Sequence, residues 1–261
     1  MKKEIWNWVA YLWDCLEVMK NISDNSVDWI ITSTPYNIAT KRKDCYYNNW
    51  YSENDNLSEE DYLNIRTSEF KEFSRIVKDD WVICYNISYH NNNPILPTLL
   101  VSKIDNETDL TIADIIAWKK RSAIPFQTSP TKLSRIIELI YVFVKKDRLH
   151  NFKTNKEISK INKKTNQKFY KNYTNFIEAK NNDWIKTTNK ATYSSELVEK
   201  IINIYFPIWS LILDPFSWIF TTAVACENTN RKWIWIEINE EYYNIWCERI
   251  INLLQKNNKS V

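Results

Sequence analysis

Short apolar runs alternate along this chain with longer stretches in which apolar residues recur at helical spacing. The apolar runs predict strands at 9–12, 27–32, 82–87, 112–118, 137–144, 211–213 and 233–238. The helical spacing predicts helices at 15–21, 58–78, 194–205, 221–228 and 240–254. Continuous apolar runs such as 27–32 are typical of parallel strands that are covered on both faces. We therefore expect an α/β fold with a mostly parallel sheet and helices on both faces.

Two polar segments interrupt this pattern. Residues 38–57 are rich in Tyr, Asn and Lys and predict a long loop, after which Ser58 is placed to cap a helix. Residues 146–191 form a polar and basic insertion within a single domain spanning 1–261. The insertion is either a solvated low-complexity excursion or a nucleic-acid contact surface, in which lysines neutralise phosphates and aromatic rings stack. On the second interpretation it is a candidate target-recognition region.

Composition narrows the class of protein further. The chain has 261 residues, 44% hydrophobic and 26% charged, which is typical of a globular protein with one substantial core. A net charge of +3 permits nucleic-acid binding without arguing for it. Five scattered cysteines and two histidines argue against a disulfide framework or a metal centre. No apolar run reaches membrane-span length, and a cytoplasmic location is the expectation.

The candidate chemistry lies in two short motifs that each follow a predicted strand. Residues 33–36 read Ser-Thr-Pro-Tyr, and residues 214–222 read Asp-Pro-Phe-Ser-Trp-Ile-Phe-Thr-Thr. The second motif is followed by a helix and by a strand that ends at Glu237. A strand, a tight turn, a helix and a second strand ending in an acid build an adenosine site, in which the acid accepts hydrogen bonds from ribose. The pair of motifs therefore predicts a nucleoside site at the carboxyl edge of the sheet.

In both motifs the chain resembles bacterial DNA amino-methyltransferases of the permuted (β) arrangement, in which the catalytic motif precedes the cofactor motif. That family's cofactor signature, Asp-Pro-Phe-x-Gly-x-Gly-Thr-Thr, is matched at Asp214, Pro215, Phe216, Thr221 and Thr222. Its catalytic signature, Ser/Asp/Asn-Pro-Pro-Tyr, is matched at Ser33, Pro35 and Tyr36, with Thr34 in place of the first proline. The similarity spans most of the chain outside 146–191.

The resemblance implies a Rossmann-like methyltransferase fold, S-adenosylmethionine as cofactor and double-stranded DNA as substrate. The exocyclic amine of a flipped base would attack the sulfonium methyl group directly. Tyr36 would stack on that base, while the Ser33 side chain and the Thr34 carbonyl would accept hydrogen bonds from the amine. The implied catalytic residues are Ser33, Thr34, Pro35 and Tyr36. The implied cofactor-binding residues are Asp14, Asp214, Pro215, Phe216, Ser217, Trp218, Thr221, Thr222 and Glu237.

The target base and the partners are less fully specified. Ser33 favours N4-cytosine, with N6-adenine close behind, and the absence of a Pro-Cys nucleophile argues against C5-cytosine methylation. A restriction–modification system with a cognate endonuclease is the expected setting. Methylation of RNA or protein is an alternative that the motif order disfavours. A further alternative is a non-catalytic DNA-binding relative whose cofactor pocket is filled by Trp218 and Phe220. The sequence specifies neither the oligomeric state nor the recognition sequence.

The chain contains no glycine, where average usage would give roughly eighteen. It contains 13 tryptophans instead. Trp218 and Phe220 occupy the two glycine positions of the cofactor signature, where glycine permits positive φ or close approach of the ligand. Relatives commonly carry glycine at four further positions, which here are Trp13, Trp81, Trp209 and Trp235. We hypothesise that many of these tryptophans are UGA codons that encode glycine in some bacteria, and UGG codons at 13, 81, 218 and 235 would contradict this.

Overall fold

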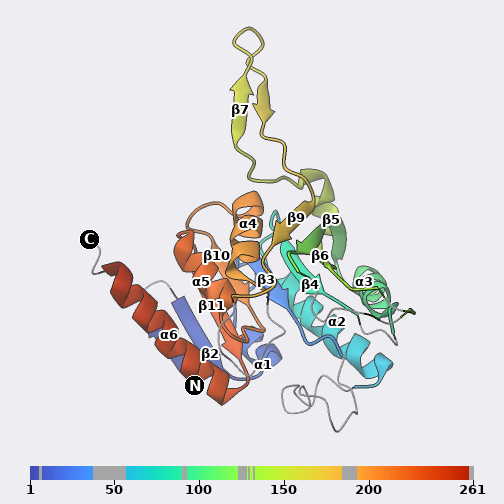
Figure 1. Ribbon diagram of the computed structural model, residues 1–261, viewed down its shortest axis with the longest axis vertical. Helices are drawn as coiled ribbons and strands as arrows, with labels where there is room; N and C mark the ends of the chain where they lie inside the picture. Colours follow the sequence, from blue (N-terminus) through green and yellow to red (C-terminus); the bar gives the residue numbers. More distant parts are fainter. Residues whose placement is uncertain are drawn as a thin grey trace.

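The computed structural model describes residues 1–5, 8–37, 57–89, 93–122, 128, 130–131, 133–183 and 193–258. Within these residues one large mixed sheet forms the centre of the molecule, with helices packed on both faces (Figure 1). The α/β fold predicted from the sequence is therefore confirmed. The predicted loop at 38–57 lies outside the described residues except for Leu57.

The strands of the large sheet follow the order β1-β2-β11-β10-β3-β4-β6-β5-β9. Their bounds are β1 Lys2–Ile5, β2 Trp8–Leu12, β3 Trp29–Ser33, β4 Ile83–Ile87, β5 Leu110–Lys120, β6 Ile137–Lys145, β9 Phe176–Ala179, β10 Leu211–Asp214 and β11 Lys232–Glu237. The five strands from β2 to β4 are parallel neighbours, whereas β6 runs antiparallel to both β4 and β5. Two further strands, β7 Ile158–Ile161 and β8 Lys168–Tyr170, form a separate hairpin.

The helices divide between the two faces of this sheet. One core cluster gathers α1 Cys15–Met19, α2 Glu59–Ile76 and α3 Leu96–Glu107, and the other gathers α4 Ser195–Tyr205, α5 Thr221–Asn228 and α6 Glu240–Asn258. A 3-10 helix, η2 Lys146–Asn151, follows β6. The predicted cap of α2 is present, because Ser58 accepts a hydrogen bond from the Asp61 N–H at 3.1 Å. None of the described helices has the length and apolar character needed to span a membrane.

The insertion at 146–191 does not behave as one unit. Every residue of its strands β7 and β8 is exposed, as in a solvated excursion. By contrast β9 joins the edge of the large sheet, where Ile177 and Ala179 are buried in the core. Alternation of buried and exposed side chains along β9 shows that one face of the strand packs on the core and the other faces solvent. We did not predict this strand, because four residues are too few to show that alternation among the surrounding lysines.

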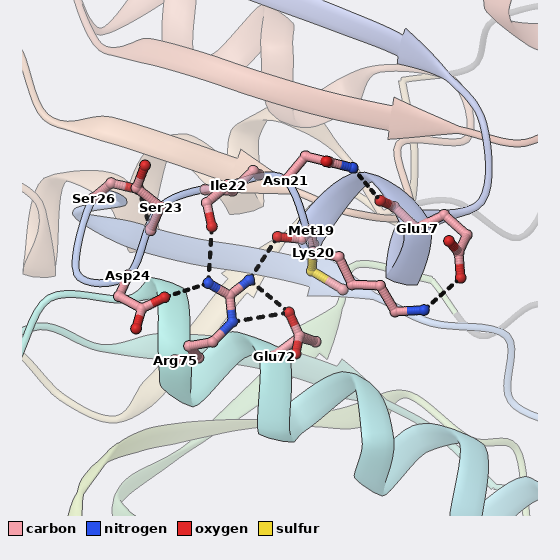
Figure 2. A network of polar contacts seen from close by, with 10 residues as sticks. All are labelled: Glu17, Met19, Lys20, Asn21, Ile22, Ser23, Asp24, Ser26, Glu72 and Arg75. Carbon is pink, nitrogen blue, oxygen red and sulfur yellow. Dashed lines mark hydrogen bonds and ion pairs between the residues drawn. The ribbon is translucent and has the colours of Figure 1, made fainter.

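One arginine connects the end of α2 to the end of α1 and to the turn that leads toward β3. Figure 2 shows Arg75 of α2 donating to the carbonyl oxygens of Met19 at 2.7 Å and Ile22 at 2.9 Å, at the end of α1 and in the turn after it. The same guanidinium pairs with Asp24 and Glu72. Five donors in a rigid fork suit this set of acceptors. The contacts hold the end of α1 and the turn after it against α2.

Candidate active site

Both sequence motifs lie at the carboxyl edge of the parallel strands. Residues 33–36 begin at the end of β3, and 214–222 begin at the end of β10, its direct neighbour. The Thr32 hydroxyl donates a hydrogen bond to Asp214 Oδ1 at 2.9 Å across this junction. Two segments about 180 positions apart in the sequence therefore meet in space, which is the geometry that the resemblance requires.

The catalytic motif forms a closed set of hydrogen bonds with the neighbouring strand. Ser33 Oγ lies 2.7 Å from the Tyr36 hydroxyl, and that hydroxyl donates to Asn86 Oδ1 at 2.7 Å. Asn86 is the register partner of Ser33 on β4, and its Nδ2 donates to the Leu139 carbonyl at 3.2 Å. Asn86 was not predicted as a site residue. It lies in a predicted strand, but only the order of strands in the sheet reveals that it faces the motif.

Protonation states follow from burial at this site. Burial, followed by the nearby negative charge of Glu138, raises the pKa of Tyr36 well above its ordinary value. The phenol is therefore a hydrogen-bond donor at neutral pH, and it donates to Asn86. The Ser33 hydroxyl directs its hydrogen to the Tyr36 hydroxyl or to Asn86 Oδ1 at 3.3 Å. Its lone pairs are then available to accept a hydrogen bond from an incoming amine.

The middle of the catalytic motif is held by two tyrosines from other elements. The Thr34 hydroxyl lies 2.6 Å from the hydroxyl of Tyr85 on β4. The hydroxyl of Tyr62 on α2 donates to the Pro35 carbonyl at 2.9 Å. Thr34 and Pro35 are both buried, so these contacts satisfy polar groups that water does not reach. The backbone of the motif is thus fixed from two sides.

Asp214 anchors the cofactor motif through four hydrogen bonds. Its carboxylate accepts hydrogen bonds from Thr32, from the Thr222 hydroxyl at 2.6 Å, from the Tyr193 hydroxyl at 3.2 Å and from the Phe216 N–H at 3.1 Å. Burial raises the pKa of this carboxyl, and the hydrogen bonds oppose that shift. With four protein donors, Asp214 positions the loop. Tyr193 was not predicted, because no motif surrounds it in the sequence.

The far side of the loop is joined to β11. The Ser217 hydroxyl donates to the Asp214 carbonyl at 3.0 Å and accepts from the Ile236 N–H at 3.1 Å. Glu237 accepts from the Trp218 N–H at 2.8 Å and from the Asn239 N–H at 2.8 Å, one on each carboxyl oxygen. Burial raises the pKa of Glu237 to about 7 despite these donors. Each oxygen retains a lone pair that a ribose hydroxyl could use.

Asp14 borders the same edge from β2. Its side chain caps α1 by accepting from the Glu17 N–H at 3.1 Å, and the Trp13 N–H donates to the Glu237 carbonyl at 3.0 Å. Phe216 and Thr221 complete the predicted set. The Phe216 ring lies 5.1 Å from the guanidinium carbon of Arg66. The Thr221 hydroxyl is a buried oxygen with no hydrogen-bond partner among the described residues. The predicted residues are therefore gathered along one edge.

Backbone conformation distinguishes among the positions predicted to need glycine. Trp218 has φ 46°, Phe220 has φ 58° and Trp209 has φ 71°, all in the left-handed region that favours glycine. Trp13, Trp81 and Trp235 adopt no positive φ. These angles are consistent with a glycine requirement at 209, 218 and 220, and they supply no backbone reason for one at the other three.

The Trp218 side chain lies between the two motifs. Its indole Nε1 donates to the Ser33 carbonyl at 3.1 Å while its backbone N–H is bound to Glu237. The Phe220 and Trp235 rings pack against each other, with their centroids 3.5 Å apart. The cavity beside them has an empty volume of about 170 Å³ and is lined by residues of β10, α5 and β11 and the loop between them, but not by Ser33, Trp218 or Glu237. The polar groups along this edge suit a nucleoside cofactor, and the Trp218 indole lies between them and the catalytic motif.

A mostly parallel sheet with these motifs at the carboxyl edge of its parallel strands defines a Rossmann-like methyltransferase fold. Residues 27–248 match the N6_N4_Mtase family, described as DNA methylase, and the chain belongs to this family. It is 24% identical over 255 residues to the type II methyltransferase M.BglII of Bacillus subtilis, covering 90% of this chain. The chain spans 66% of the length of that relative, just under two thirds.

Solved structures show the same fold. The PvuII DNA methyltransferase (cytosine-N4-specific) is similar with a TM-score of 0.70 and 19% identity, covering 91% of this chain and 84% of that chain. The M1.HpyAVI–SAM complex is similar with a TM-score of 0.58 and 23% identity, covering 92% and 98% of the two chains. At these identities the likeness establishes the architecture, and the activity of this chain is argued from its own residues.

Proposed function

We propose that this chain transfers a methyl group to an exocyclic amine of a flipped base in double-stranded DNA. A methyltransferase of this family takes that methyl group from S-adenosylmethionine. The observation that carries the proposal is the Ser33–Tyr36–Asn86 network, which lies directly beside the loop at Asp214. Acceptors fixed in this way hold an amine with its lone pair toward the donor, so that positioning supplies much of the rate.

The target base stays a finer proposal within this function. Ser33 favours N4-cytosine, with N6-adenine close behind, and both bases present an exocyclic amine. For sequence recognition we favour the part of 146–191 that returns to the carboxyl edge. There the Arg121 N–H donates to the Ala179 carbonyl at 3.2 Å, close to Lys120 and its ion pair with Glu138. A cognate endonuclease and a cytoplasmic setting are proposed with it.

A second candidate function is a DNA-binding relative that does not bind the cofactor. The hydrogen bond from the Trp218 indole to the Ser33 carbonyl favours it, because that side chain crosses the space between the motifs. In this case the catalytic edge would be intact but closed. RNA and protein methylation are further alternatives, to be excluded with those substrates.

Trp218→Gly separates the two candidates. Glycine tolerates the left-handed φ at this position and removes the indole. We expect S-adenosylmethionine affinity, measured by calorimetry, to rise at least about tenfold, a gain of 1.4 kcal/mol or more. Transfer of labelled methyl to DNA should appear or increase with it, and mass spectrometry of the nucleosides identifies the base.

The matched control is Trp209→Gly, which also replaces a left-handed tryptophan but in an exposed turn. It should leave cofactor affinity unchanged. A folded Trp218→Gly protein that still takes up no S-adenosylmethionine would overturn the methyltransferase proposal. If it binds the cofactor but methylates RNA or protein in place of DNA, the substrate assignment is wrong.

A further inference from the structure

Positive charge is concentrated in one protruding part of the molecule. We call residues 152–171 the lysine arm; it consists of the hairpin β7–β8 and the two segments that lead into and out of it. Its seven lysines and single glutamate give +6, against +3 for the whole chain, so all other residues together are net −3. The largest excess of positive charge that a polyanion would meet is therefore on the arm.

Most of that charge is unpaired. Lys171 forms an ion pair with Glu157, the single acid of the arm. Lys160, Lys163, Lys164 and Lys168 form no ion pair with any described residue. Four large apolar side chains lie among them on the hairpin with 44 to 55% of their surface exposed, namely Ile158, Ile161, Phe169 and Tyr170. Lysines interleaved with exposed rings fit phosphates and bases.

The arm has a defined shape even though none of its residues is buried. Its turn is closed by Asn162, whose side-chain oxygen accepts from the Lys164 N–H at 2.9 Å, and by Asn166 in the left-handed region. At its base the Asn155 N–H donates to the Ile204 carbonyl at 2.6 Å. A two-stranded ribbon of this kind is narrow enough to enter the major groove of a duplex.

The arm projects from the edge of the sheet opposite the catalytic motifs. Since β6 is antiparallel to β4, its last residue and the helix η2 lie where the parallel strands begin. Arg148 and Asn151 of η2 contact Asp79 and Asp80, which precede β4. In Figure 1 the arm extends upward from the body, while α1 and the start of α6 mark the carboxyl edge at the other end. One strand of five residues alone separates the edges by about 16 Å.

We propose that the lysine arm is a second DNA-binding element, which grips a segment of duplex other than the one whose base is methylated. A duplex engaged at the carboxyl edge lies at the edge of the sheet opposite to the arm. The charge requires a polyanionic partner, and two copies of the arm would repel each other. The arm would thus tether the enzyme to DNA during the search for targets, an inference that rests on the proposed DNA substrate.

The test compares Lys160→Gln/Lys163→Gln/Lys164→Gln/Lys168→Gln with a control that removes the same charge from the body. The control changes four lysines that each pair with an acid, namely Lys20, Lys71, Lys103 and Lys200. Binding of a 30-bp duplex of random sequence is followed by fluorescence anisotropy across a salt series. We expect the arm variant alone to bind at least about tenfold more weakly at 0.1 M salt, with a salt slope reduced by about three to four.

Methylation then separates the arm from the target site. The arm variant should modify a short duplex that carries the target at the wild-type rate, and should lose efficiency on plasmid DNA. Equal weakening by the control variant, or loss of activity on the short duplex with a changed target sequence, would overturn the proposal. So would a wild-type dimer that the arm variant converts to a monomer with unchanged DNA binding. If DNA binding falls as expected while neither the wild type nor any variant methylates DNA, the DNA-binding role of the arm is supported and the proposed function is wrong.

Discussion

At the scale of single residues, Tyr36 connects the catalytic motif to the rest of the site. Its hydroxyl contacts both Ser33 and Asn86, and its partly buried ring packs against the core cluster. We propose that the exposed part of the ring stacks on the flipped base. Tyr36→Ala should lower methylation at least about 100-fold, since the base loses its positioning. Cofactor affinity should stay within about twofold, as measured by calorimetry in the Trp218→Gly background. Tyr36→Phe, which keeps the ring, is the control. An equal loss of methylation and of cofactor affinity in Tyr36→Ala would assign the residue a structural role.

Glu237 predicts a pH dependence of cofactor binding. With its pKa raised to about 7 by burial, the carboxyl is largely protonated at pH 6 and ionised at pH 8. Ribose hydroxyls donate to the ionised form, so S-adenosylmethionine should bind more tightly as pH rises through 7. Calorimetry at pH 6, 7 and 8 measures this, again with Trp218→Gly as the parent. Glu237→Gln should be weaker at pH 8 and independent of pH, and a persisting pH dependence would remove Glu237 from the ribose site.

The effect of the same carboxyl on stability has the opposite direction. Its folded pKa of about 7 lies above the ordinary value of 4.5. Folding therefore favours the protonated form, and this contribution to stability is complete below pH 4.5 and lost as pH rises through 7. Ligand binding and protein stability thus draw on different protonation states of one residue.

The motif residues could be predicted from the sequence because each follows a strand that its own composition marks. Asn86 and Tyr193 could not, since the order of strands places Asn86 beside Ser33, and the packing of the segment before α4 places Tyr193 beside Asp214. The left-handed backbone at Trp218 agrees with the glycine of the signature. The contact between the Trp218 indole and the Ser33 carbonyl could not be predicted from the amino-acid sequence.

At the scale of elements, Arg75 links α1 and its following turn to α2. Arg75→Ala would remove the side-chain donor of the Ile22 carbonyl and one of the two donors of the Met19 carbonyl, which keeps the Ile22 N–H. We expect a loss of about 1 to 3 kcal/mol in unfolding free energy, measured by urea denaturation. Arg148→Ala removes a guanidinium from an exposed ion-pair network and should cost less than about 1 kcal/mol. Equal losses of unfolding free energy in the two variants would show that the hydrogen bonds from Arg75 to the backbone add no stability beyond that of its ion pairs.

The types of the long elements followed from the sequence, but their relations did not. Each predicted strand and helix is present within a few residues of its expected bounds. The antiparallel course of β6 was not foreseen, because a buried apolar run has the same composition in either direction. Strand β1 and helix α3 were also missed, the first being too short and too polar to register as an apolar run.

At the scale of the whole molecule, the two ends of the chain are interleaved in one sheet. Strands β10 and β11 from the C-terminal part lie between β2 and β3 from the N-terminal part. The site has the same origin, since each of its two motifs comes from a different part. The N-terminal strands therefore gain their central partners only after the last strands have been added. Such long-range pairing predicts a core that folds as one unit, whereas no residue of the arm is buried in that core.

A pair of deletions tests this division between core and arm. Replacing 156–171 by a short flexible linker removes no buried residue, and a modest change in loop length costs less than about 1 kcal/mol. The melting temperature should therefore shift by only a few degrees, with a single cooperative transition in calorimetry. Truncation after Phe206 removes β10 and β11, so that β2 and β3 each lose the partner on the edge where these strands had stood between them. No cooperative transition is therefore expected. A cooperative melt in the truncated chain would show that the N-terminal part folds alone, and the active site would then be assembled from two independent units.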